Sequence, residues 1–126
     1  MKPSMSLSPP PVVLLVEDDP AVRAALAFAL ETRNFTVVLA VNAAHALAQD
    51  VESAAALILD QNLPDVQGLE LLSLLRQQGV AGPAALITTH PPTDLENRAR
   101  AAGVPIFDKT RLHDGLFAWL ADVVRP

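Results

Sequence analysis

Unbroken apolar runs recur along this chain, and each is followed by a segment that mixes apolar and polar positions. The first run, Val12–Val16, holds five aliphatic residues without a polar interruption. A strand with one exposed face would alternate, whereas a strand covered on both faces reads as a continuous apolar run. The same pattern predicts further strands at residues 35–40, 55–60, 84–88 and 104–108.

The segments between these runs have apolar residues three or four positions apart, which is the spacing of one helix face. The first segment starts at Pro20 and places Val22, Leu26 and Leu30 on such a face. Asp19 is suited to cap this helix, because its carboxylate can accept hydrogen bonds from the free N–H groups of the first turn. Equivalent spacing predicts helices at residues 43–51, 66–77, 93–102 and 111–123.

Five strand-then-helix units joined by short loops predict an α/β fold, a doubly wound parallel sheet of five strands between layers of helices. The chain of 126 residues is long enough for one such domain and its core. Residues 1–11 are rich in serine and proline, so we expect a flexible N-terminal lead-in there and one domain over residues 12–126.

Composition and charge narrow the function. A formal net charge of −5 disfavours direct binding of nucleic acid or of an anionic membrane, since both require clustered lysine and arginine. The chain has no cysteine, which excludes disulfides and thiolate metal sites and fits a reducing compartment. No apolar run approaches the roughly 18 residues that span a bilayer, and the first residues do not resemble a signal peptide. We therefore expect a soluble, cytoplasmic protein.

Polar residues gather where the predicted strands end. Glu17 and Asp18 follow the first strand, the third ends on Asp60, the fourth ends on Thr88, and the fifth leads into Lys109. Open parallel sheets bind their ligands at the carboxyl ends of the strands. The topology therefore predicts three carboxylates, one hydroxyl and one ammonium at a single edge of the sheet.

Three crowded carboxylates repel one another, so at least one should have a raised pKa unless a cation compensates. Mg²⁺ is the suitable cation, because it prefers oxygen ligands and typically takes one or two carboxylates together with phosphate oxygens. Asp18 and Asp60 are the expected direct ligands, with the backbone carbonyl of Asn62 as a neutral third. Glu17 is one methylene longer and is expected to act directly or through a water.

Asp60 would still have one free oxygen beside Mg²⁺, Lys109 and Thr88. A carboxylate held in this way is arranged to attack a phosphoryl group, while the neighbouring positive charge and hydroxyl neutralise the transferred oxygens. The residues alone thus predict phosphoryl transfer to an aspartate.

The stretches VVLLVEDDP, LILDQNLPDVQGLELL, ALITT and PIFDK, in this order, resemble the receiver domain of two-component response regulators. The resemblance runs from Val12 to the end of the chain. It implies a flavodoxin-like fold with strand order 2-1-3-4-5 and five helices. It also implies that Asp60 is the phosphoacceptor, Thr88 the switch hydroxyl and Lys109 the family's lysine, and that Gly68 is the glycine after the phosphorylation loop.

The same resemblance implies a Mg²⁺ site made of Asp18, Asp60 and the Asn62 carbonyl, with Glu17 as the other member of the acidic pair. A histidine kinase or a phosphotransfer protein would be the phosphodonor. The signal would pass to a downstream protein through the face formed by the fourth helix, the fifth strand and the fifth helix. A homodimer is compatible with the sequence.

Three positions depart from the family pattern. Thr110 stands where a proline usually follows the lysine, Ile106 where an aromatic switch residue is common, with Phe107 next to it, and Thr89 where a small residue is usual. These positions usually relay the phosphorylation signal. They motivate an alternative reading, in which the domain binds partners without being phosphorylated.

An enzyme of another class is a further alternative, namely a Mg²⁺-dependent phosphohydrolase with an aspartyl nucleophile. Such an enzyme typically needs a second acid two residues after the nucleophile, and Asn62 cannot shuttle a proton. We therefore expect no turnover enzyme, only uptake of a phosphoryl group and its slow loss. The fourth predicted helix has a narrow apolar stripe of Leu95, Ala99 and Ala102, so we expect it to be the most loosely packed and to shift on phosphorylation.

Overall fold

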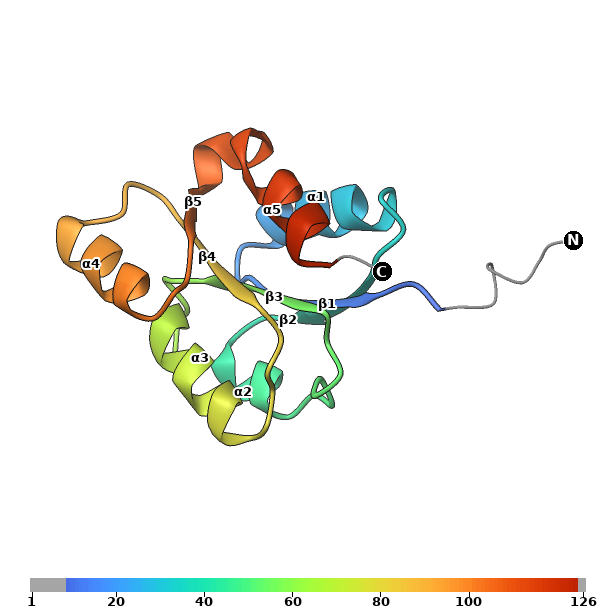
Figure 1. Cartoon of the computed structure of the whole chain (residues 1–126), viewed down its shortest axis with the longest axis horizontal. Coiled ribbons are helices and arrows are strands. Elements are labelled where there is room, and N and C mark those ends of the chain that lie inside the picture. The colour runs from blue at the N-terminus through green and yellow to red at the C-terminus, as the bar shows by residue number, and fades with distance from the viewer. Residues whose placement is uncertain (1–8, 125–126) are drawn as a thin grey trace, which may run out of the picture.

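The computed structural model describes residues 9–124 and contains one parallel sheet of five strands (Figure 1). The strands are ordered β2-β1-β3-β4-β5. Most of the predicted lead-in at residues 1–11 lies outside the described residues, as do the last two residues, so the division of the chain at residue 12 stays a prediction. The strand bounds are β1 (Val12–Val16), β2 (Thr36–Ala40), β3 (Ala56–Asp60), β4 (Ala84–Thr88) and β5 (Ile106–Asp108).

Helices cover both faces of this sheet (Figure 1). One face carries α1 (Pro20–Glu31) and α5 (Leu116–Val123), which pack on the same core cluster. The other face carries α2 (Ala43–Leu47), α3 (Gly68–Gln77) and α4 (Thr93–Ala101). The predicted doubly wound, flavodoxin-like α/β fold with strand order 2-1-3-4-5 and five helices is confirmed.

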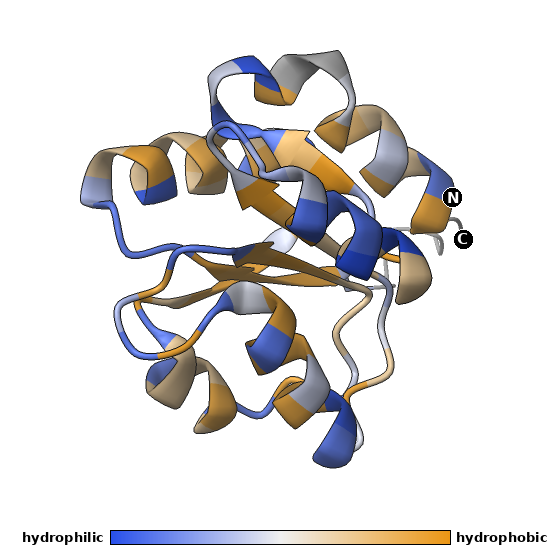
Figure 2. Cartoon of the chain, turned by 90° about the vertical axis from the view of Figure 1, so that its left-hand side faces the viewer, coloured by the Kyte–Doolittle hydropathy of each residue, from blue (hydrophilic) through white to orange (hydrophobic). Residues whose placement is uncertain are grey.

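The apolar runs are continuous because successive side chains of a strand enter two different cores. In β1, Leu14 and Val16 face α2, α3 and α4, whereas Val13 and Leu15 face α1 and α5. Figure 2 shows hydrophobic residues along the strands, and hydrophobic and hydrophilic residues alternating around the helices. Among residues 9–124, no helix has both the length and the apolar character needed to cross a membrane.

The second helix is shorter than predicted, since it ends at Leu47 instead of continuing to Val51. The N–H of Ala48 closes the last turn on the carbonyl of Ala44. Val51 is nevertheless 2% exposed and joins the same core from the following loop. A buried loop residue at helical spacing imitates one more helical turn, which is why the apolar pattern overran the helix.

The third helix starts at Gly68, two residues later than predicted. Asn62 and Gln67 pair in a short antiparallel bridge, which keeps the intervening residues in a loop. Gly68 then packs against the backbone at the end of β3, where an added Cβ would lie 2.4 Å from the carbonyl oxygen of Asp60. Glycine is therefore required at this position by close approach of the backbone.

The last helix begins at Leu116, five residues later than predicted. A 3₁₀ segment, Lys109–Asp114, precedes it, and Arg111 leaves helical geometry with φ −141° and ψ 41°. The Asp108 carboxylate accepts a hydrogen bond from the N–H of Thr110 at 2.9 Å, which caps this segment. The capping acid and the kink separate the turn after Lys109 from the helix proper, and apolar spacing does not register either feature.

The remaining boundaries differ by one or two residues. The strand β5 begins at Ile106, two residues later than predicted, and β2 and β3 each begin one residue late. In α4 the buried residues are Leu95 and Ala99, while Ala102 lies past the helix end and is exposed. The apolar stripe of α4 is therefore narrower than predicted.

Candidate functional site

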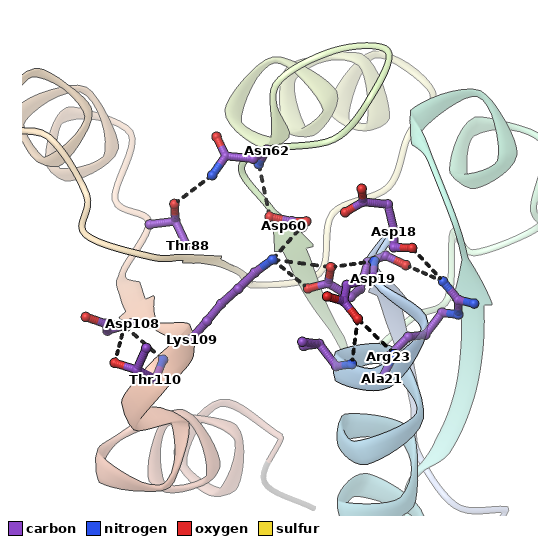
Figure 3. Close-up of polar contacts among 12 residues, drawn as sticks. Asp18, Asp19, Ala21, Arg23, Asp60, Asn62, Thr88, Asp108, Lys109 and Thr110 are labelled. Atoms are coloured by element: carbon purple, nitrogen blue, oxygen red, sulfur yellow. Dashed lines mark hydrogen bonds and ion pairs between the residues drawn. The ribbon is translucent and has the colours of Figure 1, made fainter.

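Three strands deliver charged side chains to the same edge of the sheet (Figure 3). Val16 of β1 pairs with Leu59 of β3, so the residues that follow them, Glu17 and Asp60, lie level with each other. Lys109, directly after β5, reaches both: its Nζ lies 2.9 Å from Glu17 Oε1 and 3.0 Å from Asp60 Oδ2. The structure thus brings together two carboxylates and one ammonium group that are far apart along the chain.

Glu17 is buried and held from several sides. Its N–H donates to the carbonyl of Ala40 at 3.0 Å, and its Oε2 accepts the N–H of Asp19 at 3.0 Å. Burial raises the pKa of Glu17 to about 7; the hydrogen bonds from Asp19 and Lys109 oppose the shift, and the charge of Asp60 adds to it. A carboxyl group with a raised pKa was predicted in this cluster, but desolvation, not mutual repulsion, is the main cause.

Asp18 and Lys109 are charged more readily than Glu17, because the pKa of each is shifted in favour of its ionised form. The pKa of Asp18 is lowered, first of all because the Asp60 side chain hydrogen-bonds to its exposed carboxylate. Burial by itself would lower the pKa of Lys109, but hydrogen bonds to Glu17 and Asp60 outweigh it and raise that pKa. The site therefore keeps its ammonium over the whole neutral range, while Glu17 bears the cost of burial.

The oxygens of this cluster fit a hard divalent cation. Glu17, Asp18 and Asp60 can each offer one carboxylate oxygen, and these three oxygens lie within 4.8 Å of one another. Glu17 Oε1 and Asp60 Oδ2 are buried beside Lys109, yet neither receives a well-aligned hydrogen bond from the described residues. Buried oxygens without donors are costly. Mg²⁺ prefers oxygen ligands, and carboxylate oxygens that accept few hydrogen bonds can serve as such ligands.

Asn62 joins Asp60 to Thr88. Its N–H donates to Asp60 Oδ1 at 3.0 Å, and its side-chain Nδ2 donates to Thr88 Oγ1 at 3.2 Å (Figure 3). Sequence reasoning assigned Asn62 a role for its backbone carbonyl and missed the side-chain contact with Thr88. The two residues are 26 positions apart, and no local pattern indicates that the loops after β3 and β4 meet.

Arg23 is a second residue that sequence reasoning missed. From the first turns of α1 its Nη1 donates to the carbonyls of Glu17 at 2.9 Å and Asp18 at 3.2 Å. A long cationic side chain one turn after the capping Asp19 can reach back to the turn before the helix, and this spacing was a usable signal. Sequence reasoning considered the apolar face of this helix and assigned Arg23 no role.

The response regulator receiver domain family model matches residues 13–108 of this chain. The chain belongs to this family. The matched range contains every site residue described above except Lys109, which follows it directly. The residue roles that the family implies stay predictions for this receiver domain.

Curated relatives share a third or so of their residues with this receiver domain. The transcriptional regulatory protein FixJ of Rhizobium meliloti is 33% identical over 104 residues, covering 81% of this chain and 50% of FixJ. TcrA of Mycobacterium tuberculosis is 38% identical over 77 residues, covering 60% of this chain and 30% of TcrA. An uncharacterised 14.6 kDa protein of Leptolyngbya boryana is 32% identical and is covered over 72% of its length. The receiver domain thus spans half or less of the two named regulators.

Solved structures agree on the fold. The non-phosphorylated receiver domain of HemR from Leptospira biflexa superposes with a TM-score of 0.76 at 25% identity, over 92% of this chain and 98% of that one. The receiver domain of a Francisella response regulator gives 0.78 at 19% identity, over 90% and 96%. The second likeness is at the level of the fold alone.

Two of the three departures from the family pattern, Ile106 and Thr89, lie in different environments of this receiver domain. Ile106 packs on the core beneath α3 and α4, whereas Phe107 points to the opposite core and contacts Trp119 at a ring distance of 6.2 Å. The aromatic residue of β5 therefore faces away from α4. Thr89 is exposed in the wall of a depression of about 360 Å³ that also includes Thr88.

Proposed function

We propose that this receiver domain accepts a phosphoryl group on Asp60 from a histidine kinase or a phosphotransfer protein, in a reaction that uses Mg²⁺. The observation that carries the proposal is the environment of Asp60. Its side chain is 1% exposed, Oδ1 accepts the N–H of Asn62, and Oδ2 lies 3.0 Å from Lys109 Nζ. A carboxylate that is buried, oriented and charge-balanced in this way is a candidate nucleophile.

Asp18, Asp60 and the Asn62 carbonyl would hold the metal, with Glu17 as a direct or water-mediated ligand. When bound, Mg²⁺ supplies positive charge beside the phosphoryl oxygens. The two acids differ in how readily they lose their protons. The lowered pKa of Asp18 favours its ionised form, whereas Glu17, whose pKa is raised to about 7, holds its proton more tightly.

The transfer step follows from these positions. An oxygen of Asp60 forms a bond to phosphorus while the bond between phosphorus and the donor histidine nitrogen breaks; that nitrogen keeps the electron pair, and with one proton on the ring the donor leaves as neutral imidazole. Lys109 stays near Asp60 and balances the negative charge that the phosphoryl group brings. Thr88, 2% exposed and oriented by Asn62, can donate its hydroxyl to a phosphoryl oxygen. Attack of water on phosphorus later breaks the bond to the Asp60 oxygen, releases inorganic phosphate and restores the carboxylate.

Incubation with acetyl phosphate and Mg²⁺, followed by intact-mass measurement, tests the proposal. We expect a labile phosphate adduct on the wild-type protein and none on Asp60→Asn, because the amide lacks the nucleophilic oxygen. Asp50→Asn is the control, since Asp50 is an exposed aspartate in the loop after α2. No adduct on the wild type, or an adduct that survives Asp60→Asn, would refute the assignment.

We further propose that phosphorylation acts on a downstream protein through the face of α4, β5 and α5, and that the reaction takes place in the cytoplasm. The acidic, cysteine-free composition suits that compartment. The second candidate function is a receiver-like module that binds partners without phosphorylation. Two features favour this second function: Thr89 is exposed, and β5 has Ile106 at the usual aromatic position with its aromatic residue, Phe107, one position later. Mg²⁺ binding of ordinary affinity without phosphate uptake would support this second function.

A further inference from the structure

Arg23 lies beside the acidic cluster, but its guanidinium binds backbone carbonyls and not carboxylates. Within the described residues its guanidinium forms no ion pair, although Glu17, Asp18 and Asp19 all lie within six positions of it along the chain. One nitrogen, Nη1, instead donates to the two backbone carbonyls of Glu17 and Asp18. Arg23 approaches this turn from the side opposite to Lys109 (Figure 3).

We propose that Arg23 is a positioning residue for the metal site of this receiver domain. By holding the carbonyls of Glu17 and Asp18, it fixes the turn between β1 and α1 so that both carboxylates face Asp60. The inference rests on the proposed function, because it takes Mg²⁺ as the ligand of the cluster. It adds a residue that contacts none of the metal-binding carboxylate oxygens.

The turn needs such a support at Asp18. Glu17 is anchored by its N–H on Ala40 and by its side chain, and Asp19 is anchored because its Oδ1 caps α1 at Ala21 and Val22. The exposed Asp18 lies between these anchors. Among the hydrogen bonds of the described residues, Arg23 is the group that holds its carbonyl. Without that bond, rotation of the two peptide groups around Asp18 would move its carboxylate away from Asp60.

Two effects of Arg23 on metal affinity oppose each other. Its positive charge repels a divalent cation, so removing the charge alone would tighten binding. Losing an oriented ligand weakens binding, and removal of a group that orients metal ligands typically costs about 10- to 100-fold in affinity. The repulsion is screened at physiological ionic strength, where the Debye length is about 8 Å. We therefore expect orientation to dominate.

Arg23→Met and Arg23→Lys separate these effects. We expect calorimetric titration with Mg²⁺ at physiological salt to show a dissociation constant about tenfold higher for Arg23→Met. Arg23→Lys keeps the charge and can still reach one carbonyl, so its affinity should lie between those of the wild type and Arg23→Met. A role through charge alone predicts wild-type affinity for Arg23→Lys and tighter binding for Arg23→Met, which would overturn the proposal.

Arg76→Met is the matched control. Arg76 of α3 also uses one nitrogen, Nη1, to hold two loop carbonyls, those of Val80 at 2.9 Å and Gly82 at 2.7 Å. These carbonyls precede β4, at the sheet edge opposite to the site. We expect Arg76→Met to leave the Mg²⁺ dissociation constant within about twofold of wild type while lowering thermal stability as much as Arg23→Met. Equal weakening of Mg²⁺ binding by both variants would reduce Arg23 to a general structural role and overturn the proposal.

Phosphorylation is measured separately, so the two proposals can fail independently. With acetyl phosphate and limiting Mg²⁺, Arg23→Met should take up phosphate more slowly than wild type, because its defect lies in metal affinity. A wild-type protein that binds Mg²⁺ but takes up no phosphate would remove the proposed function and leave the role of Arg23 standing. A wild-type protein that binds no Mg²⁺ would remove the role of Arg23.

Discussion

The residues of the site are placed at the expense of stability. Glu17 and Asp60 are each fully buried, and their shared partner Lys109 is one ammonium for two carboxylates. Removing carboxylates from water is unfavourable unless charges and hydrogen bonds compensate. Binding sites of this kind often exchange stability for function. The burial that raises the pKa of Glu17 is part of that cost.

Glu17 gives a pH dependence with a definite sign. Its pKa rises from 4.5 to about 7 on folding, so the folded protein binds the proton more tightly than the unfolded chain. The contribution of Glu17 to stability is therefore fully present below pH 4.5 and is lost as the pH rises toward 7. Above pH 7 we expect Glu17→Gln to be more stable than wild type by up to about 3 kcal/mol, because the amide carries no charge to desolvate.

Urea denaturation in the presence of a metal chelator, at pH 5 and pH 8, measures this difference. The gain of Glu17→Gln over wild type should be larger at pH 8 than at pH 5. Glu31→Gln, at the exposed end of α1, should show no such pH dependence. A Glu17→Gln protein that is less stable than wild type at pH 8 would contradict the prediction.

At the scale of elements, hydrogen bonds to the starts of two helices hold the loop after β3 in place beside the site. The loop after β3 is tied down at both ends: Asp65 accepts the N–H groups of Ala43 and Ala44 at the start of α2, and Gln61 Oε1 accepts the N–H of Leu69 in α3. Those hydrogen bonds lower the pKa of Asp65. The loop that follows Asp60 is thus fixed against two helices.

Gly68 is the tightest point of that arrangement. In Gly68→Ala the new Cβ would meet the Asp60 carbonyl at 2.4 Å, so either α3 or the end of β3 must move. We expect a loss of about 1–3 kcal/mol in the free energy of unfolding, the range typical of overpacking, together with slower phosphate uptake. Ser73→Ala, at an exposed position of α3, is the control. Wild-type stability and uptake rate in Gly68→Ala would show that the close approach has no consequence.

The helix α4 is expected to respond most to phosphorylation. Its buried residues are Leu95 and Ala99, whereas α3 buries Gly68, Leu71, Leu72 and Leu75. Elements with few buried apolar contacts open at low free-energy cost. Hydrogen exchange with Mg²⁺, with and without beryllofluoride as a phosphoryl mimic, should show the largest change in protection in α4. Equal changes across the helices would contradict the prediction.

At the scale of the whole molecule, neighbouring residues of β5 enter opposite cores of the sheet. Ile106 packs against the core beneath α2, α3 and α4. The opposite core holds Phe107 against Trp119 beneath α1 and α5. The aromatic pair thus lies on the α5 side of the proposed signalling face, whereas the aliphatic Ile106 lies on its α4 side.

Much of this architecture is readable from local patterns. The ends of β1 and β4 and the start of α1, with its Asp19 cap, are as predicted. The predictions failed at the C-terminal end of α2 and at the start of α5, where Val51 is a buried loop residue and Arg111 breaks the helical geometry. Burial and spacing do not distinguish a helix from an apolar loop that packs on the same core.

The sequence by itself determined the fold class and the residues that meet at the sheet edge, because burial on two faces and strand-end polarity are written locally in the chain. The tertiary structure alone decided how those residues are supported. Lys109 contacts Glu17 across 92 positions and Asn62 contacts Thr88 across 26. The desolvation that raises the pKa of Glu17 likewise depends on everything packed around it. Such contacts depend on distances in space, which local periodicity does not encode.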